Sequence, residues 1–220
     1  LLSGVYLQKN DKANAEEILK TGIGKNPKAT TLYLTLADFY TREKKLDDAI
    51  NTVRKLTELN QKEGRYKLML AGLLWNSGRE QESRDLLNKM VLDNAQNEDT
   101  WVQSGGFYLS RGKSADAEQV LKEGLQKNSK SFKIRFALGD LYFNMGKSDN
   151  AISILKECLT LKKDSKDPDI IQAKNALAKV YLGNQNVSEG SKYVEEVLKD
   201  NPKNVEAHFL KGNILLARGD

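Results

Sequence analysis

The residues that could support acid–base, nucleophilic or metal chemistry are few and scattered along the chain. The only histidine, His208, has no cysteine or second histidine at the spacing of a zinc site. The only cysteine, Cys158, lies in the apolar segment ILKECL (154–159), which favours a small buried hydrophobic residue over a reactive thiol. Catalysis needs a base, a nucleophile or a metal set that converges in space. We therefore predict no enzyme activity, no metal site and no cofactor.

Neighbouring acidic residues and glycines could also mark chemistry, but their surroundings point elsewhere. The acidic pairs are Glu16-Glu17, Asp47-Asp48 and Glu195-Glu196. Each is typical of a solvated helix face. The pair Gly105-Gly106 falls inside a predicted helix, with one residue in a packing position and the next facing outward, so it is not a phosphate-binding loop.

The composition indicates a folded chain that does not enter a membrane. Of 220 residues, 39% are hydrophobic and 30% are charged, with a net charge of +5. No run of roughly 18 apolar residues exists, so we expect no membrane insertion by this segment. The opening residues 1–6 lack the basic flank and the apolar length of a signal peptide.

A repeat of 34 residues organises the chain. Rows begin at Thr30, Gly64, Glu98 and Phe132 and, after five additional residues, at Ile171 and Val205, with a partial row before Thr30. The eighth position is always small: Ser3, Ala37, Ala71, Gly105, Gly139, Ala178, Gly212. So is the twentieth: Ala15, Ala49, Ser83, Ala117, Ala151, Gly190. The eleventh is always large: Tyr6, Tyr40, Leu74, Tyr108, Tyr142, Tyr181, Leu215.

These positions predict two antiparallel helices in each row, here called the first and the second helix. Small residues allow two helix backbones to approach closely, and the large ones fill the space beside each contact. Residues at helical spacing share one face, as Tyr33, Leu36, Ala37 and Tyr40 do in a first helix. An all-α fold of stacked helix pairs follows.

The fifteenth position marks the break between the two helices. It holds Gly78, Gly112, Gly146 and Gly219, with Asn10, Lys44 and Gln185 in the other rows. Glycine suits the left-handed backbone that ends a helix. We expect Ser114 and Ser148 to cap the helices that follow. In the five-residue insert, Asp167 is expected to cap a lengthened first helix that begins at Pro168.

These residues resemble the tetratricopeptide repeat family, whose first helix carries a Trp–Leu–Gly–Tyr series. The row from Glu98 comes closest, with Trp101, Gly105, Tyr108, Ala117 and Leu121 at matching positions. The resemblance implies a right-handed α-solenoid over residues 1–220. Its repeats would be 1–29 (partial), 30–63, 64–97, 98–131, 132–170, 171–204 and 205–220 (first helix only).

The resemblance also implies a ligand surface, because the first helices of the family line a concave groove. Carried over, the groove holds Asp38, Arg42, Arg65, Leu68, Trp75, Val102, Leu109, Lys133, Phe136, Asp140, Phe143 and Asn144. It continues through Gln172, Asn175, Lys179, Leu182, Phe209 and Asn213. Apolar anchors with a polar rim suit a helix or an extended peptide. We therefore expect a protein–protein interaction scaffold whose partner is a protein or peptide.

Two alternatives stay open. The aromatic residues Trp75, Phe136 and Phe143 could pack between neighbouring first helices and not contact a ligand. Nucleic-acid binding through a basic surface is the alternative function, and it would use Arg111, Lys113, Lys122, Lys127, Lys130, Lys133 and Arg135. Acidic residues interrupt that surface, and it lacks several aromatic residues for stacking bases.

The ends of the chain resemble cut ends of a longer array. The final row stops after one apolar helix, whereas a solenoid's natural end carries a polar capping helix. We expect weak self-association through these uncovered ends. The Lys- and Asn-rich style also resembles bacterial repeat proteins, including lipoproteins linked to polysaccharide export and surface-protein sorting. That resemblance implies a place at the cell envelope, facing the periplasm.

Overall fold

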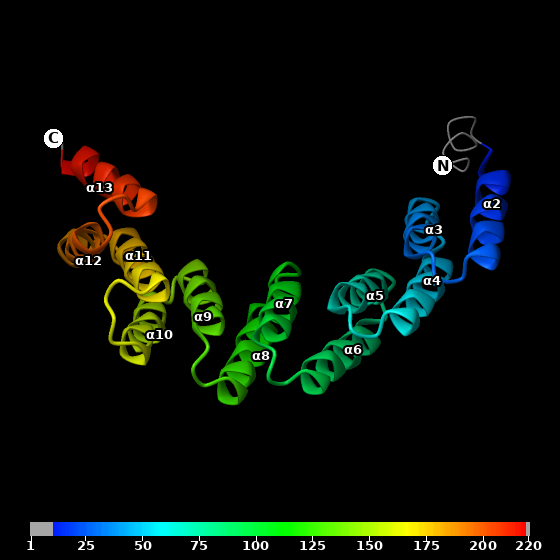
Figure 1. Ribbon diagram of the computed structural model, residues 1–220, viewed down its shortest axis with the longest axis horizontal. Coiled ribbons are helices and arrows are strands. Elements are labelled where there is room, and N and C mark those ends of the chain that lie inside the picture. Colours follow the sequence, from blue (N-terminus) through cyan, green and yellow to red (C-terminus); the bar gives the residue numbers. More distant parts are fainter. Residues whose placement is uncertain (1–10, 219–220) are drawn as a thin grey trace. The chain divides into compact units, whose positions relative to one another are not determined.

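The structure is a computed structural model that describes residues 11–218. This range contains twelve α-helices and no strand. The chain divides into two compact units, residues 1–93 and 94–220 (Figure 1). In the first unit the helices are α2 (Lys12–Lys25), α3 (Thr30–Arg42), α4 (Leu46–Leu59), α5 (Gly64–Asn76) and α6 (Glu80–Asp93).

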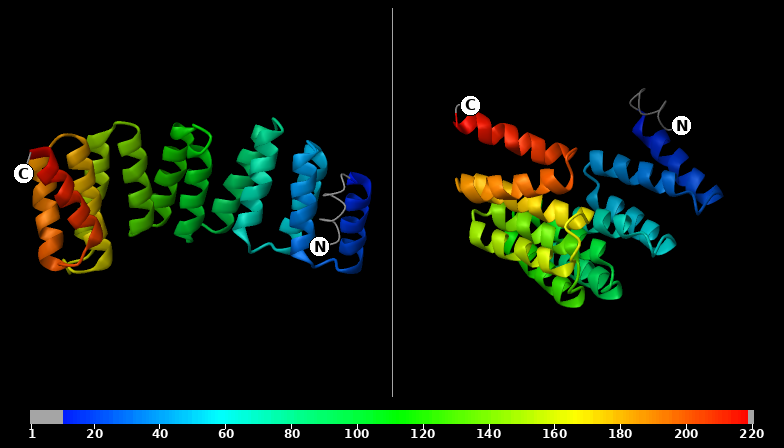
Figure 2. Two further views of the ribbon diagram at one scale, coloured as in Figure 1. Left: turned by 90° about the horizontal axis from the view of Figure 1, so that it is seen from above. Right: turned by 60° about the vertical axis from the view of Figure 1, so that its left-hand side comes forward.

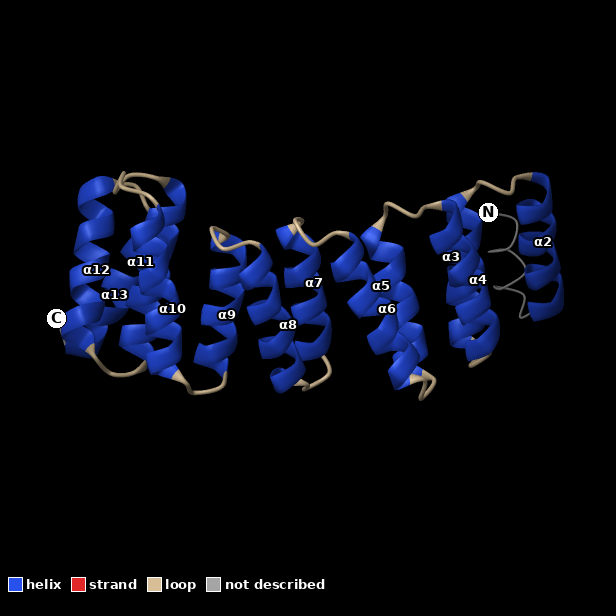
Figure 3. Ribbon diagram, turned by 90° about the horizontal axis from the view of Figure 1, so that it is seen from below, coloured by secondary structure: helices blue, strands red, loops and turns tan. Residues whose placement is uncertain are grey.

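The second unit contains seven described helices. They are α7 (Glu98–Leu109), α8 (Ser114–Lys127), α9 (Phe132–Asn144), α10 (Ser148–Leu161), α11 (Pro168–Gly183), α12 (Val187–Asp200) and α13 (Val205–Arg218). Short loops join the helices (Figure 3). The longest of them precedes α11, and the insert, residues 166–170, begins in this loop and continues into the first turn of α11. An all-α array of helical hairpins is therefore confirmed. The predicted positions Ser3, Tyr6, Asn10 and Gly219 lie outside the described residues.

Each hairpin turn is built in the same way. Gly78 has a φ of +81°, and Gly112 and Gly146 have φ of +69° and +71°. At the first of these turns, Gly78 N donates to Trp75 O at 3.1 Å and Arg79 N donates to Leu74 O at 2.9 Å. This pair of bonds satisfies the last carbonyls of the helix. The left-handed backbone predicted for these turns is thus confirmed. Lys44 and Gln185 adopt the same conformation although they are not glycine, each with a φ of 59°.

The predicted serine caps are wrong. Ser114 and Ser148 are the first residues inside α8 and α10, and the cap residues are Lys113 and Lys147, which make no side-chain cap bond. The reason is the short turn, in which a single residue separates the left-handed glycine from the next helix. The cap predicted at Asp167 is confirmed, because its side chain accepts from Asp169 N at 2.9 Å and Pro168 begins α11.

The small positions lie where the two helices of a hairpin meet. Ala15, Ala49 and Ala151 are completely buried. Ser83 is also completely buried and satisfies its hydroxyl by donating to Ala71 O at 2.8 Å, which joins the twentieth and eighth positions of one row. The predicted close approach of the two helices is confirmed at these positions.

Two layers of helices form within the second unit (Figure 1). The first helices α7, α9, α11 and α13 lie on one side, and α8, α10 and α12 lie on the other. Each neighbouring pair of first helices is in contact: α7 with α9, α9 with α11, and α11 with α13. The two views of Figure 2 both place α11, α12 and α13 side by side. The first helices therefore form one continuous layer in this unit, and the side of this layer that points away from the second helices is one continuous surface.

The fourth position of a row ties the first helix to the loop before it. Trp101 is 1% exposed, and its Nε1 donates to Ala95 O at 2.9 Å. Tyr33 Oη donates to Pro27 O at 3.0 Å, and His208 Nε2 lies 2.8 Å from Pro202 O. Trp101 is therefore a core residue, whereas His208 is exposed but anchored to its own loop.

Charged residues occupy the same position in three other rows, and in two of them, at Arg135 and Lys174, the side chain is buried. Arg135 Nε lies 3.1 Å from a carboxylate oxygen of Glu157, and Arg135 Nη1 donates to Ser131 O. Lys174 Nζ lies 3.1 Å from Asp200 and 3.3 Å from Glu196. An acidic residue on the following second helix thus compensates each buried cation, which would otherwise be costly to bury.

Candidate partner-binding surface

The first unit contains five of the residues predicted to face a ligand, on α3 and α5. Asp38 and Arg42 are exposed and pair with each other at 2.9 Å. Arg65 is exposed and lies over the Tyr66 ring, with its guanidinium carbon 4.8 Å from the ring centroid. Leu68 and Trp75 are half-buried. Trp75 packs against Arg84 on α6, whose guanidinium carbon lies 5.4 Å from the centroid of the Trp75 ring.

Seven more of the predicted residues lie on α7 and α9 of the second unit. Leu109, Lys133, Asp140 and Asn144 are exposed, whereas Val102, Phe136 and Phe143 are half-buried. Lys133 Nζ contacts Asp99 at 2.9 Å, so this cation is already paired within the surface. Phe136 packs on Phe132 of its own helix, with ring centroids 6.2 Å apart. Some of these side chains are therefore open to solvent, and others pack against neighbouring side chains of the protein.

A cleft opens at the C-terminal end of this surface, among α9, α11 and α13. Its volume is ≈ 570 Å³, and its walls are mainly apolar. Its lining consists of Phe143, Lys179, Leu182, Gly183, Val187, Glu206, Phe209, Leu210, Asn213 and Ile214. Five of these were predicted for the groove, namely Phe143, Lys179, Leu182, Phe209 and Asn213.

Two glycines hold the apolar walls of this cleft in place. A Cβ on Gly183 would lie 2.6 Å from the Phe143 ring, so the ring packs directly on the backbone of α11. A Cβ on Gly190 would lie 2.7 Å from the Leu182 side chain, so Leu182 packs on the backbone of α12 in the same way. Both walls are therefore held against backbone and present a preformed surface.

The opposite wall belongs to α13 and is open to solvent. Phe209 is 66% exposed, although it is one of the largest apolar side chains of the helix. Leu210 and Ile214 are buried and attach the helix to the unit. Large apolar side chains that remain exposed beside an apolar cleft commonly mark an interaction site.

Two charged residues border the cleft. Lys179 of α11 lies over the Phe143 ring, with Nζ 6.0 Å from its centroid. Glu206 stands on the α13 side. Neither forms an ion pair with any residue in the part of the chain that the structure describes.

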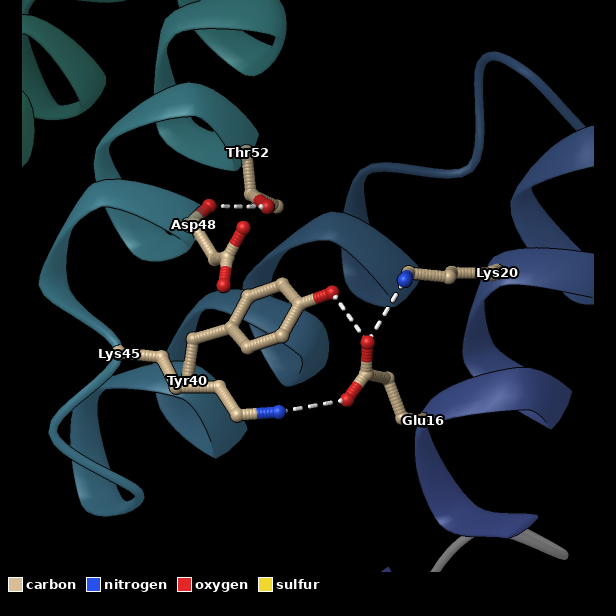
Figure 4. Close-up of polar contacts among 6 residues, drawn as sticks. All are labelled: Glu16, Lys20, Tyr40, Lys45, Asp48 and Thr52. Atoms are coloured by element: carbon tan, nitrogen blue, oxygen red, sulfur yellow. Dashed lines mark hydrogen bonds and ion pairs between the residues drawn. The ribbon is translucent and has the colours of Figure 1, made fainter. Parts of the chain in front are cut away.

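A polar cluster that joins neighbouring hairpins was not predicted (Figure 4). Glu16 accepts hydrogen bonds from Lys20 Nζ at 2.6 Å, Lys45 Nζ at 3.0 Å and Tyr40 Oη at 3.0 Å. These donors, Lys20 above all, lower the pKa of the Glu16 carboxyl from 4.5 to about 2. The cluster ties α2 to the next hairpin and does not border the apolar cleft.

The same cluster recurs in the second unit. Glu118 accepts from Lys122 at 2.6 Å, Tyr142 at 3.2 Å and Lys147 at 3.3 Å, and these donors lower its pKa. The sequence contains a spacing that could have predicted this cluster. From each glutamate, a lysine follows after four residues, a tyrosine after 24 and a second lysine after 29.

The basic residues proposed for nucleic-acid binding are partly neutralised. Arg135 is buried beside Glu157, and Lys122 and Lys133 pair with acidic residues. Arg111 stacks on the Phe107 ring, with its guanidinium carbon 3.5 Å from the ring centroid. Four of the seven basic residues therefore engage in ion pairs or ring packing within the protein.

The one thiol and the one imidazole of the chain lie in residues 11–218. Within that range, no three His, Cys, Asp or Glu side chains gather as a metal ion would require. Cys158 is fully buried, and burial raises its thiol pKa to about 11. No helix among the described residues is long and apolar enough to cross a membrane.

The comparisons with known proteins agree with this architecture. Models of the tetratricopeptide repeat match residues 6–73, 132–165 and 175–220, which together make up most of the chain. The chain belongs to the tetratricopeptide repeat family. No curated protein matches it.

Solved structures show the same fold at low sequence identity. A tetratricopeptide repeat protein from Parabacteroides merdae is 21% identical, over 98% of this chain and 84% of that chain, with a TM-score of 0.53. TTC0263, a thermophilic protein of this family from Thermus thermophilus, is 18% identical, over 86% of this chain and 100% of that one, with a TM-score of 0.54. YrrB, described as having an unusual peptide-binding site, is 18% identical, over 90% of this chain and 99% of that chain, with a TM-score of 0.51.

Proposed function

We propose that this chain is a protein-binding scaffold that holds a peptide or helix of its partner against its first helices. The cleft among α9, α11 and α13 carries the proposal. It combines a volume of ≈ 570 Å³ with apolar walls and with an aromatic side chain, Phe209, that is 66% exposed. Apolar clefts of about 300–1,000 Å³ with a few polar groups are the usual form of binding sites.

Three further observations support the proposal. The walls formed by Phe143 and Leu182 are held against helix backbone, so little ordering is needed when a ligand binds. Family members serve as scaffolds for many unrelated partners, and YrrB, which shares the fold, is described as having a peptide-binding site.

The resemblance to bacterial envelope proteins adds a proposed location, the periplasmic side of the cell envelope. Fractionation of the native cells would test this location.

A selection from a displayed library of random dodecapeptides would test the function. We expect peptides that bind the wild-type chain and lose at least about fivefold in affinity for Phe209→Ala, which corresponds to roughly 1 kcal/mol. The matched control is Leu92→Ala on α6, because Leu92 is 67% exposed and lies outside the cleft. Selected peptides that bind both variants equally well, or a selection that enriches none, would count against the proposal.

A further inference from the structure

We propose that the cleft among α9, α11 and α13 recognises a peptide in which one large apolar side chain is flanked by a carboxylate. The apolar side chain packs on Phe143 and Leu182, and the carboxylate pairs with Lys179. This inference rests on the proposed function and names the chemistry of its ligand. It commits to an acidic peptide segment of another protein as the occupant.

The apolar part of the ligand follows from the walls of the cleft. Phe143 and Leu182 present preformed apolar surface on one side, and Phe209 presents exposed aromatic surface on the other. A side chain placed between them removes apolar area on both walls from water, which is the main source of binding free energy at such sites. Asn213 lines the same cleft and offers an amide that can bond to a peptide backbone.

The acidic part of the ligand follows from Lys179. This side chain is exposed, borders the cleft and has no anionic partner among residues 11–218. Two other cations on the first helices differ in this respect, since Lys133 pairs with Asp99 and Lys174 pairs with Asp200. A carboxylate beside the bound apolar side chain would complete the missing ion pair.

Glu206 determines which way round the peptide binds in the cleft. It lies on the α13 side of the cleft, whereas Lys179 lies on the α11 side. A second carboxylate on the α13 side would be repelled, and a neutral or basic residue there would be tolerated. The order of charges along the bound segment is therefore part of the recognition, as expected where charges at the rim select partners.

Charge reversal at Lys179 tests this inference with the selected dodecapeptides. We expect the peptides selected on the wild-type chain to share an aromatic or large aliphatic residue next to Asp or Glu. Lys179→Glu should weaken their binding at least about fivefold, or roughly 1 kcal/mol. A selection repeated on Lys179→Glu should favour Lys or Arg in place of the acid. Glu206→Lys should strengthen the binding of the acidic peptides.

The matched control is Lys199→Glu, which changes the net charge equally from an exposed position on α12. It should leave the affinity within about twofold, since rim charges away from a ligand contribute little. Circular dichroism of each variant should show unchanged helix content because both lysines are exposed. Peptides that lose affinity for Phe209→Ala but bind Lys179→Glu as well as the wild type would overturn the acidic specificity and leave the proposed function standing. A selection without enrichment would overturn both.

Discussion

The carboxylate of Glu16 on α2 accepts a hydrogen bond from the hydroxyl of Tyr40 on α3 at 3.0 Å (Figure 4). Tyr40 itself is 3% exposed, so its hydroxyl is the polar tip of a core residue. Lys20 and Lys45 donate to the same carboxylate, which therefore joins two consecutive hairpins. Glu118 and Tyr142 repeat this contact in the second unit.

The contact predicts a pH-dependent contribution of Glu16 to stability. Its folded-state pKa is about 2, lowered from 4.5 chiefly by the hydrogen bond from Lys20. A lowered pKa stabilises the folded state at pH values above 4.5, and this contribution is lost as the pH falls towards 2. Glu16→Gln should therefore cost about 1 kcal/mol at pH 7 and progressively less below pH 4.5, by urea denaturation.

Glu17→Gln is the matched control for this prediction, because Glu17 is the exposed neighbour on the same helix. It should change the urea midpoint little at any pH. A stability difference between Glu16→Gln and the wild type that stays constant from pH 7 to pH 2 would show that the carboxylate is not the stabilising group.

Two adjacent glycines of α7 predict opposite effects of one substitution. A Cβ on Gly105 would lie 2.8 Å from the buried Leu121 side chain, whereas a Cβ on Gly106 would meet nothing within 4 Å. Gly105→Ala should destabilise by roughly 1–3 kcal/mol through overpacking. Gly106→Ala should stabilise by up to about 1 kcal/mol, since alanine is the better helix former. Thermal unfolding of both variants measures this, and shifts of the same sign would contradict the described packing of α7.

The repeat explains why much of the fold could be predicted. A small residue that recurs at the same position of the rows indicates a close contact between helices, as Gly105 and Ala117 illustrate. The lengthened helix α11 was also predictable, since Asp167 and Pro168 together are a strong start signal. The caps at Ser114 and Ser148 were not, because a serine suits both the cap and the first helical position, and the length of the turn decides between them.

The candidate site was less predictable. The family pattern selected Phe143, Lys179 and Phe209 as surface residues, but it does not show which of the predicted positions enclose a cleft. That depends on contacts between residues far apart in the chain, such as Phe143 on Gly183. The ion pairs of Arg135 and Lys174 were missed for the same reason, since each partner lies on a different helix.

Cys158 should be unreactive in the folded protein. It is fully buried, and burial raises the pKa of its thiol to about 11, so the thiol stays protonated at pH 8. A thiol reagent such as Ellman's reagent should label it only as the second unit opens. The labelling rate should therefore rise with urea in parallel with the loss of helix. Rapid stoichiometric labelling without denaturant would contradict the packing of α10.

Nucleic-acid binding through the basic residues should be weak or unmeasurable. Single-stranded RNA should show no binding near 0.1 M salt, since Arg135, Lys122 and Lys133 already pair with acidic residues. Fluorescence anisotropy with labelled oligonucleotides measures this. Tight binding that falls steeply with salt and is lost in Lys127→Glu or Lys130→Glu would revive this function.

Titration calorimetry of a selected peptide against the wild-type chain, Phe209→Ala and Leu92→Ala tests protein binding through the cleft most directly. The two substituted side chains are equally exposed, so they differ in position and not in accessibility. We predict a saturable 1:1 binding isotherm that Phe209→Ala weakens at least about fivefold and Leu92→Ala leaves unchanged. Equal affinities for all three proteins would contradict a binding site in the cleft among α9, α11 and α13.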